Sequence, residues 1–361
     1  MSSTWGKSLS LTVFGESHGT GVGMVLSGLP AGTPVCQQQL AAHLARRAPG
    51  GPLATSRKES DRPRILSGVL NGRATGAPIA MMIENEDARS GDYAQLAHLA
   101  RPGHADFSAY VRYHGFNDTR SGGHLSGRVT AAFVMAGSLA RGWLSQKGVL
   151  IGSHILSIGE EKDAAFPLHP TAELFTSLAQ KPLPVLGDSA SEAFARRIET
   201  ARAQGDSVGG VIECAAIGVP AGWGSPLAGA VESRAAQLLF AVPGVKGVSF
   251  GAGYAASSRS GSENNDPFTI QDGAVTALTN NDGGVQGGVT NGMPILLTAA
   301  MRPTPTIARE QQTVDFKQNQ PATLSAKGRH DPCIAVRAPV VVESMLALAL
   351  AECCLEVEGE R

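Results

Sequence analysis

The first residues in the chain that could do chemistry are a serine and a histidine on a glycine-flanked turn, Gly15-Glu-Ser17-His18-Gly19. The spelling matches the Gly-x-Ser-x-Gly turn of serine hydrolases, which requires a following helix and an upstream loop of oxyanion donors. Position 17 leaves no room for that loop, and the residues that follow predict a strand. Ser17 and His18 therefore suit contact with an anionic oxygen, the serine as a hydrogen-bond donor and the histidine as an acid.

Two further segments place a histidine close to a carboxylate. Residues 101–106 read Arg-Pro-Gly-His-Ala-Asp, and residues 329–332 read Arg-His-Asp-Pro. An aspartate such as Asp106 can raise the basicity of a nearby imidazole and make His104 a usable acid near neutral pH. Taken alone, each segment is equally typical of a solvent-exposed turn. Their chemical meaning depends on the other segments of the chain.

A local cluster of cations could hold an anionic ligand. The formal net charge is only −1, which argues against general nucleic-acid binding, where a strongly basic face is expected. Guanidinium groups bind phosphate and carboxylate through parallel hydrogen bonds, so such a cluster suits a small anion, with a solvated basic loop as the alternative. The stretch 46–64 contains six cations and only two acidic residues, Glu59 and Asp61. The cations are Arg46, Arg47, Arg57, Lys58, Arg62 and Arg64.

Composition places the chain among globular proteins. Of its 361 residues, 42% are hydrophobic and 17% are charged, and 44 glycines favour tight turns and loops that approach a ligand closely. The five cysteines form no Cys-x-x-Cys and the first residues lack a signal peptide's apolar run, so we expect a reducing cytoplasm and no metal site. The apolar stretch 338–355 carries Glu343 and Glu352, which favours a buried core helix over a membrane span.

Short β-like runs alternate irregularly with helical patterns, and these elements must position the reactive residues. The pattern at 129–143 is apolar on nearly every side, which predicts a helix between two layers. We therefore expect an α+β fold in a single domain over residues 1–361, a layered β-α-β sandwich whose helical core layer is flanked by antiparallel sheets. Strands are predicted at 9–14, 22–26, 64–69, 79–83, 149–158, 208–217, 245–250 and 294–298, and further helices at 189–204, 230–242 and 340–355.

The two halves of the chain resemble each other. A strand, a Gly-x-Pro-Ala-Gly turn at 28–32, a helical pattern and another strand recur around a second such turn at 218–222. This similarity predicts an internal pseudo-repeat, although glycine-rich turns also resemble one another by chance. The polar stretch 302–327 shows no regular pattern and is long for a connection without structure, so we expect it to be functional.

The order of these segments matches one known family. The chain resembles chorismate synthases along nearly its whole length. Each motif is moderately specific, and seven of them in the same order make chance agreement improbable. The seven segments are 14–19 and 101–106, which resemble the two histidine signatures, 205–210, 218–222 and 281–292, which are similar to glycine-rich signatures, and 302–306 and 327–333.

The resemblance implies a carbon–oxygen lyase of the shikimate pathway. Such an enzyme performs the anti-1,4-elimination of phosphate and a C6 hydrogen from 5-enolpyruvylshikimate 3-phosphate to give chorismate. It also implies an obligatory reduced FMN, although the reaction is redox-neutral overall. No nicotinamide-binding fold is recognisable, so we expect NADPH only as an indirect source of reductant, through a separate flavin reductase. The family implies a homotetramer, and neither nucleic acid nor membrane is an expected partner.

The resemblance implies roles for individual residues as well. His18 would protonate the departing phosphate, His104 would handle the proton on the reduced flavin, and Asp331, near flavin N5, would help to remove the C6 proton. Ser17 and Ser126 would support these groups. The implied substrate cations are Arg47, Arg57, Arg101, Arg128 and Arg329, which suit a substrate with one phosphate and two carboxylates. The implied flavin contacts are His124, Leu125, Ser126, Pro243, Gly244, Gly287, Arg302, Pro303, Thr304, Pro305, Thr306 and Arg329.

The chain departs from the family pattern at three places, one of which is Ala338-Pro339, where the proline stands one residue early. The usual Arg-Ser-Ser-x-Arg-Glu-Thr-Ala reads here His-Leu-Ser-Gly-Arg-Val-Thr-Ala at 124–131, so His124 and Leu125 replace an arginine and a serine. Leu53 stands where a second loop arginine is usual, and Arg57 is the candidate that replaces it. A flavin- or phosphate-binding protein that kept the scaffold without lyase activity is the second hypothesis. The three proton-handling residues are all present, which favours the enzyme.

Overall fold

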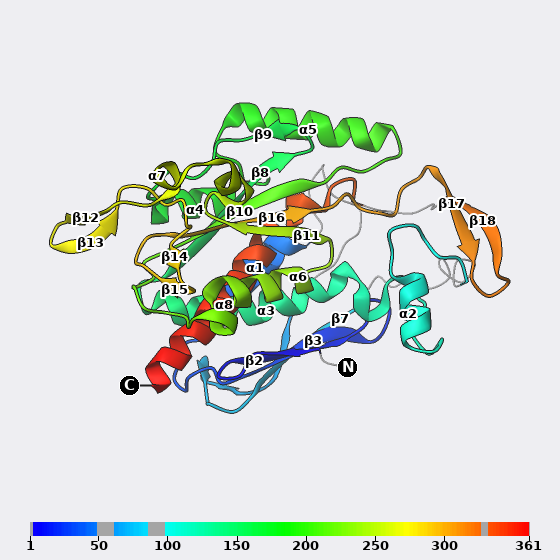
Figure 1. Ribbon diagram of the computed structural model, residues 1–361. Coiled ribbons are helices and arrows are strands. Elements are labelled where there is room, and N and C mark those ends of the chain that lie inside the picture. The colour runs from blue at the N-terminus through cyan, green and yellow to red at the C-terminus, as the bar shows by residue number, and fades with distance from the viewer. Residues whose placement is uncertain (1–2, 49–60, 86–97, 326–330, 361) are drawn as a thin grey trace.

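Two five-stranded antiparallel sheets form opposite layers of the molecule (Figure 1). The computed structural model describes residues 3–48, 61–85, 98–325 and 331–360. The first sheet has the order β1 (Thr4–Trp5), β2 (Ser10–Gly15), β3 (Gly21–Ser27), β7 (Ile79–Glu84) and β4 (Arg64–Ser67). The second has the order β11 (Val245–Phe250), β16 (Ile295–Met301), β10 (Gly210–Ile217), β8 (Leu150–Ile158) and β9 (Glu161–Lys162).

Four helices fill the space between the sheets (Figure 1): α1 (Gln37–Arg47), α3 (Thr130–Ser145), α6 (Val231–Ala241) and α8 (Pro339–Gly359). The side chains of α8 are buried as far as Cys354, because α3 and α6 pack against it within the layer and β8 packs against it from the second sheet. A helix that is apolar on all sides requires neighbours around its whole circumference. The predicted sandwich with a helical core layer is confirmed.

The second sheet is covered on its outer face as well, by α4 (Ala172–Gln180) and α5 (Asp188–Ala203). Gly152 on β8 permits this contact, because a Cβ there would lie 2.3 Å from the ring of Phe175 on α4. The first turn of α5 begins at Asp188, one residue before the predicted start. Neither α4 nor α2 (Asp106–Arg112) was predicted, because helices of 9 and 7 residues are too short to show a clear apolar period.

The expectation that 302–327 lacks regular structure is wrong for its second half. There β17 (Glu310–Asp315) and β18 (Gln320–Ser325) form an antiparallel hairpin that lies beside α2 (Figure 1). The Asp315 carboxylate closes the turn by accepting the N–H groups of Lys317 and Gln318, both at 2.9 Å. Most side chains of this hairpin are polar, so its sequence lacks the alternation that indicates a half-buried strand.

Smaller elements complete the part of the chain that the structure describes. Within that part, no helix combines the length and the apolar character needed to cross a bilayer. The remaining two-stranded pairs are β5 (Val69–Leu70) with β6 (Arg73–Ala74), β12 (Phe268–Gln271) with β13 (Ala274–Ala277), and β14 (Val285–Gln286) with β15 (Val289–Thr290), and α7 covers Gly261–Asn264.

The two halves of the chain share one topology, as the predicted pseudo-repeat requires. The four principal strands of each half have the spatial order first, second, fourth, third, as β2–β3–β7–β4 and as β8–β10–β16–β11. In each half one helix, α1 or α6, follows the second strand, and another, α3 or α8, follows the fourth. The glycines after the second strands correspond too: Gly28 and Gly218 have φ of 88° and 75°. A Cβ at either position would lie 1.8 or 2.2 Å from a backbone carbonyl oxygen, so both require glycine.

Candidate active site

Ser17 and His18 lie on the tight turn between β2 and β3. Gly15, at the end of β2, has a φ of 93°, and a Cβ there would lie 2.1 Å from the carbonyl oxygen of Gly21. Ser17 Oγ is 3.2 Å from His18 Nδ1, and its N–H donates to the Gly123 carbonyl at 3.1 Å. The His18 side chain is buried. A strand follows this turn instead of a helix, which excludes the nucleophile turn of serine hydrolases.

Segment 123–129, two short 3-10 helices that lead into α3, lies directly against this turn. His124 Nδ1 is 2.7 Å from the Gly15 carbonyl oxygen, and His124 Nε2 is 2.8 Å from Ser3 Oγ. A carbonyl only accepts, so Nδ1 carries a proton, and in the neutral ring Nε2 accepts from the serine hydroxyl. Both ring nitrogens of His124 thus have partners within the protein. Ser126 Oγ accepts from the N–H of Arg128 at 3.2 Å and caps the second 3-10 helix.

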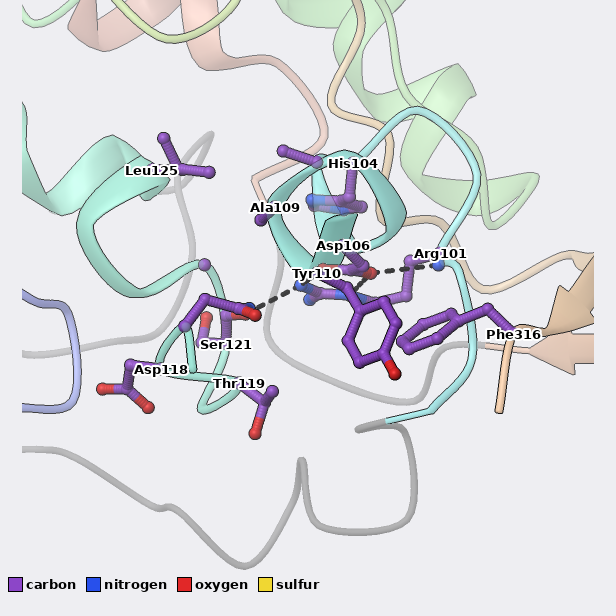
Figure 2. A pocket seen from close by; sticks show the side chains of 13 residues that line it. Arg101, His104, Asp106, Ala109, Tyr110, Asp118, Thr119, Ser121, Leu125 and Phe316 are labelled. Atoms are coloured by element: carbon purple, nitrogen blue, oxygen red, sulfur yellow. Dashed lines mark hydrogen bonds and ion pairs between the residues drawn. The ribbon is translucent and has the colours of Figure 1, made fainter. Parts of the chain in front are cut away.

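The 101–106 segment folds around an internal ion pair. The Arg101 guanidinium donates two hydrogen bonds of 2.7 Å to the Asp106 carboxylate and one of 2.8 Å to the Ser121 carbonyl (Figure 2). The aspartate that was expected to support His104 is therefore engaged by Arg101. His104 Nε2 lies 2.5 Å from Thr306 Oγ1, which connects this turn to the 302–306 segment.

A small cavity of about 50 Å³ opens beside His104 (Figure 2). Leu125 and the rings of Tyr110 and Phe316, whose centroids are 4.7 Å apart, contribute its apolar lining, and 117–122 contribute polar groups. Sites for small molecules usually have volumes of about 300 Å³ or more. The cavity therefore admits part of a ligand at most.

Several of the predicted flavin contacts lie next to the turn of His104, among them Arg302, Pro305 and Thr306. The Arg302 N–H donates to the Gly244 carbonyl at 2.9 Å, which joins the Pro243–Gly244 turn to the 302–306 segment. A Cβ at Gly103 would lie 2.7 Å from Cβ of Pro305, so the 101–106 turn packs directly on this segment. The buried Thr304 hydroxyl has no hydrogen-bond partner among the described residues. A buried polar atom of this kind indicates a place for a ligand or water.

One predicted flavin contact lies elsewhere. Gly287 is in the β14–β15 turn, and the carbonyl of the next residue, Gly288, accepts from the Val231 N–H at the start of α6. Gly244 follows the end of the same helix. The 11 residues of α6 span about 16 Å at 1.5 Å per residue. Within this chain, Gly287 is therefore not brought together with the other predicted flavin contacts.

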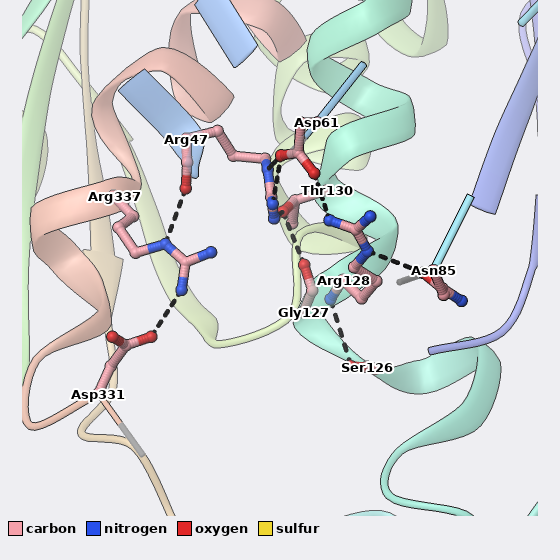
Figure 3. A network of polar contacts seen from close by, with 9 residues as sticks. All are labelled: Arg47, Asp61, Asn85, Ser126, Gly127, Arg128, Thr130, Asp331 and Arg337. Atoms are coloured by element: carbon pink, nitrogen blue, oxygen red, sulfur yellow. Dashed lines mark hydrogen bonds and ion pairs between the residues drawn. The ribbon is translucent and has the colours of Figure 1, made fainter. Parts of the chain in front are cut away.

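Two predicted substrate arginines share one carboxylate (Figure 3). Arg47, the last residue of α1, directs Nε and Nη2 to Asp61 Oδ2 at 2.9 and 2.5 Å. Arg128, just before α3, directs Nη1 to Asp61 Oδ1 at 2.5 Å. The side chains of Arg47 and Asp61 are each 2% exposed, and that of Arg128 is 8% exposed. Two cations and one carboxylate leave one net positive charge, which suits an anionic ligand.

Asn85, the residue after β7, connects Arg128 of this arginine pair to the β2–β3 turn, which carries His18. Its Oδ1 accepts from Arg128 Nε at 3.1 Å. Its Nδ2 donates to the carbonyls of Glu16 and Gly19 at 2.8 and 3.0 Å, on either side of His18. The amide therefore fixes Arg128 relative to the turn that carries His18.

Arg337 connects the same group to Asp331 (Figure 3). Arg337 Nη1 is 2.7 Å from Asp331 Oδ2, and Arg337 Nε donates to the Arg47 carbonyl at 2.7 Å. Hydrogen bonds thus run from Asp331 through Arg337, Arg47, Asp61 and Arg128 to Asn85 and the histidine turn. The fold brings together residues from both ends of the chain.

Asp61, Asn85 and Arg337 are absent from the predicted site residues. The partner of an arginine leaves no local motif, and the opposite charge of Asp61 within the basic stretch is the nearest signal in the sequence. Of the positions named from the sequence, Leu53, Arg57, Lys58, Glu59 and Arg329 lie outside the described residues.

Charge around the cavity is uneven. Hydrogen bonds from Arg120 are the main cause of the lowered pKa of Asp118. Partial desolvation acts against them, and the charge of His18 makes the smallest contribution to the lowering.

Burial raises the pKa of the Cys333 thiol to about 12. The cysteine two residues after Asp331 therefore stays protonated and is no nucleophile.

Comparison with known proteins agrees over nearly the whole chain. The model of the family described as chorismate synthase matches residues 9–355. The chorismate synthase of Thermococcus kodakarensis is 44% identical over 347 residues, or 96% of each chain. That of Dehalococcoides mccartyi is 41% identical over 356 residues, or 98% of this chain and 97% of the relative. A crystal structure of a chorismate synthase has a TM-score of 0.77 at 31% identity and covers 98% of this chain and 94% of that one.

Proposed function

The chain belongs to the chorismate synthase family, and we propose that the residues joined by hydrogen bonds around His18, His104 and Asp331 form its active site. The chain is a lyase that eliminates phosphate and a C6 hydrogen from 5-enolpyruvylshikimate 3-phosphate to give chorismate, with reduced FMN. One observation carries the assignment of the site. Hydrogen bonds link Asp331 through Arg337 to Arg47 and link Arg128 to Asn85 (Figure 3), and Asn85 also donates to the turn that carries His18.

Arg47 and Arg128 bind the anionic groups of the substrate in this proposal. Each guanidinium is oriented by Asp61, and forked N–H donors match phosphate and carboxylate oxygens. Arg101 lines the cavity beside His104 and stays in the proposed set, although Asp106 accepts two of its hydrogen bonds. Arg57 and Arg329 are proposed for the same role.

Reduced FMN fits the region around 302–306. When bound, it supplies an electron-rich, anionic group beside the substrate. The unpartnered hydroxyl of Thr304 and the cation of Arg302 suit the polar atoms of such a group. Gly287 is the exception in this set, because α6 separates it from the rest. The residues that would hold the flavin are His124, Leu125, Ser126, Pro243, Gly244, Arg302, Pro303, Thr304, Pro305, Thr306 and Arg329.

Three side chains move protons in the proposed reaction. His18 gives a proton to the oxygen of the departing phosphate, with Ser17 Oγ next to its Nδ1 and Ser126 capping the adjoining turn. Asp331, held by Arg337, takes part in removing the C6 proton. His104 holds a proton beside the 302–306 segment, where Thr306 orients its ring. Because charge changes at several positions, orientation of charged groups contributes more than a covalent nucleophile.

An anaerobic assay tests the activity directly. Substrate is added to the protein with photoreduced FMN, and the absorbance of chorismate is followed. Chorismate formation that depends on both protein and reduced FMN is expected. Substrate binding without chorismate would favour a binding protein that kept the scaffold. Cleavage of an acyl ester that is lost in Ser17→Ala would favour a hydrolase.

The supply of reduced flavin and the assembly are further parts of the proposal. We expect a separate flavin reductase to supply reduced FMN, with NADPH as an indirect source, so NADPH alone should not support turnover whereas dithionite should. We expect residues 1–361 to act as one domain and to form a homotetramer, with a mass four times the chain's 37.2 kDa in light scattering. A cytoplasmic location is supported by five cysteines that are all unpaired.

A further inference from the structure

We propose that Asp61 is a positioning residue for this reaction, because it holds Arg47 and Arg128 in the orientation in which they bind the anionic groups of the substrate. The proposal rests on the proposed function of these two arginines. Asp61 acts through them and not by contact with the substrate.

The contacts of Asp61 fix both guanidinium groups. Arg47 presents two N–H donors to one carboxylate oxygen, and Arg128 presents a third donor to the other oxygen. Such paired contacts set the plane of a guanidinium as well as its distance. The two arginines come from different helices, and without a carboxylate between them their charges would repel each other. Asp61 therefore determines how far apart the two cations lie.

The same contacts set the position of the arginines relative to His18. Arg128 Nε donates to Asn85 (Figure 3). The Asn85 amide in turn donates to the carbonyls of Glu16 and Gly19, before and after His18. A displaced Asp61 carboxylate would move Arg128 relative to the proposed proton donor. A misplacement of about 1 Å can lower an enzymatic rate about 10²-fold.

The chain contains a matched control. Glu343 on α8 is also a buried carboxylate shared by two arginines, Arg46 of α1 at 2.7 Å and Arg141 of α3 at 2.5 Å. Arg141 lies about 17 Å along α3 from Thr130, at 1.5 Å per residue. Glu343→Gln therefore removes the negative charge shared by two arginines in the same manner as Asp61→Asn, and one of its two arginines, Arg141, lies far along α3 from the proposed site.

The direction of the change in KM distinguishes positioning from simple charge balance. If Asp61 only neutralised two buried cations, its removal would increase the positive potential of the site and attract the anionic substrate more strongly. KM would then fall. If Asp61 positions the arginines, its removal lets them separate and KM rises in spite of the added positive charge.

The test compares Asp61→Asn with wild type and with Glu343→Gln in the anaerobic assay with reduced FMN. We expect KM for 5-enolpyruvylshikimate 3-phosphate to rise about tenfold or more in Asp61→Asn and to stay within about twofold in Glu343→Gln, because only one pair of arginines contacts substrate. Unfolding by urea should show that both variants are destabilised. An unchanged or lower KM in Asp61→Asn, or an equal rise in both variants, overturns the proposal.

Two further variants keep the proposal testable. If Asp61→Asn does not fold, Asp61→Glu retains the charge and moves the carboxylate by one methylene. We expect its KM to rise about threefold or more, because paired arginine contacts require a carboxylate at a fixed place. An unchanged KM overturns the proposal.

Arg128→Lys tests the premise that Arg128 binds the substrate. An unchanged KM there would reject the substrate role of Arg128, whereas a raised KM beside an unaffected Asp61→Asn would reject only the positioning role.

Discussion

Two regions of the molecule contain the same chemical unit, a buried carboxylate between two arginines, in different surroundings. Consecutive residues of α1 supply one arginine to each unit, Arg46 to Glu343 and Arg47 to Asp61. The hydroxyl of Ser153 on β8 completes the Glu343 unit at 2.7 Å, so all its members belong to helices and a strand of the sandwich. The Asp61 unit instead continues to Asn85 and the turn of His18. Because the two units have the same composition, the different roles that we propose for them depend on their neighbours.

The electrostatics of the Glu343 unit fit a structural role. Burial would raise the pKa of Glu343, but the charges of Arg46 and Arg141 and the hydrogen bonds from Arg46 and Ser153 overcome it and lower the pKa to about 2. Burial and then the charge of Arg141 lower the pKa of nearby His43 to about 3, so this histidine is neutral at pH 7. Near pH 7, His43 is therefore neutral and Glu343 is fully ionised. Neither group changes its charge near neutral pH.

The largest expected effect is on stability, from Glu343→Gln. Removal of one partner from a buried ion pair usually costs about 3–5 kcal/mol, because uncompensated charges remain in the interior. We expect a loss of that size in urea unfolding, with kcat and KM unchanged for the folded fraction. A loss below about 1 kcal/mol, the range of exposed ion pairs, would contradict a structural role for this unit.

Asp331→Asn and His104→Ala should have the opposite profile. Each should lower turnover by about 10² or more, equivalent to about 2.7 kcal/mol, because proton transfer by a placed side chain is lost. The urea midpoint should change much less than in Glu343→Gln, because each variant leaves the Glu343 unit intact. Near-normal turnover in either variant would remove that residue from the mechanism and weaken the distinction between the two regions.

The pH dependence of stability offers a third comparison. The folded pKa of Glu343, about 2, lies below its usual value of 4.5, so the unfolded chain binds this proton first. The stabilisation is complete above pH 4.5 and is lost as pH falls toward 2. Between pH 5 and pH 3 wild type should lose about 2 kcal/mol more than Glu343→Gln, at about 1.4 kcal/mol per pH unit below 4.5. Parallel pH profiles in urea unfolding would refute the lowered pKa.

The fold was largely predictable because its main elements have clear apolar patterns. The strand predicted at 245–250 is β11, and the apolar stretch 340–355 is the buried helix α8. The β17–β18 hairpin was missed because exposed strands with mostly polar side chains have no apolar period. The pseudo-repeat appeared in the sequence only as two similar glycine turns. At the other equivalent positions of the two halves, any apolar residue can fill the core, so the sequences there need not resemble each other.

The site was predictable only where a local motif carries the chemistry. His18 and His104 stand in short glycine-rich segments. The structure places His18 next to Ser17, as predicted, but places His104 next to Thr306 instead of the predicted Asp106. Only the family resemblance distinguished Arg47 from Arg46. The local sequence could not, because neighbours on a helix point about 100° apart and tertiary packing decides which faces the site. Asp61 was visible only as a counter-charge, since its contact with Arg128 joins elements distant in the sequence.

The smallest expected effect comes from Ser153→Ala. The serine hydroxyl donates a single hydrogen bond of 2.7 Å to Glu343, while the contacts of the carboxylate with Arg46 and Arg141 remain. A hydrogen bond to a charged group contributes about 1.5 kcal/mol, so urea unfolding should detect a loss of that size. KM and kcat should stay at wild-type values, because the bond lies within the structural unit. A raised KM in Ser153→Ala would mean that strain in the Glu343 unit reaches Arg47 through α1, and the two units would then form a single network.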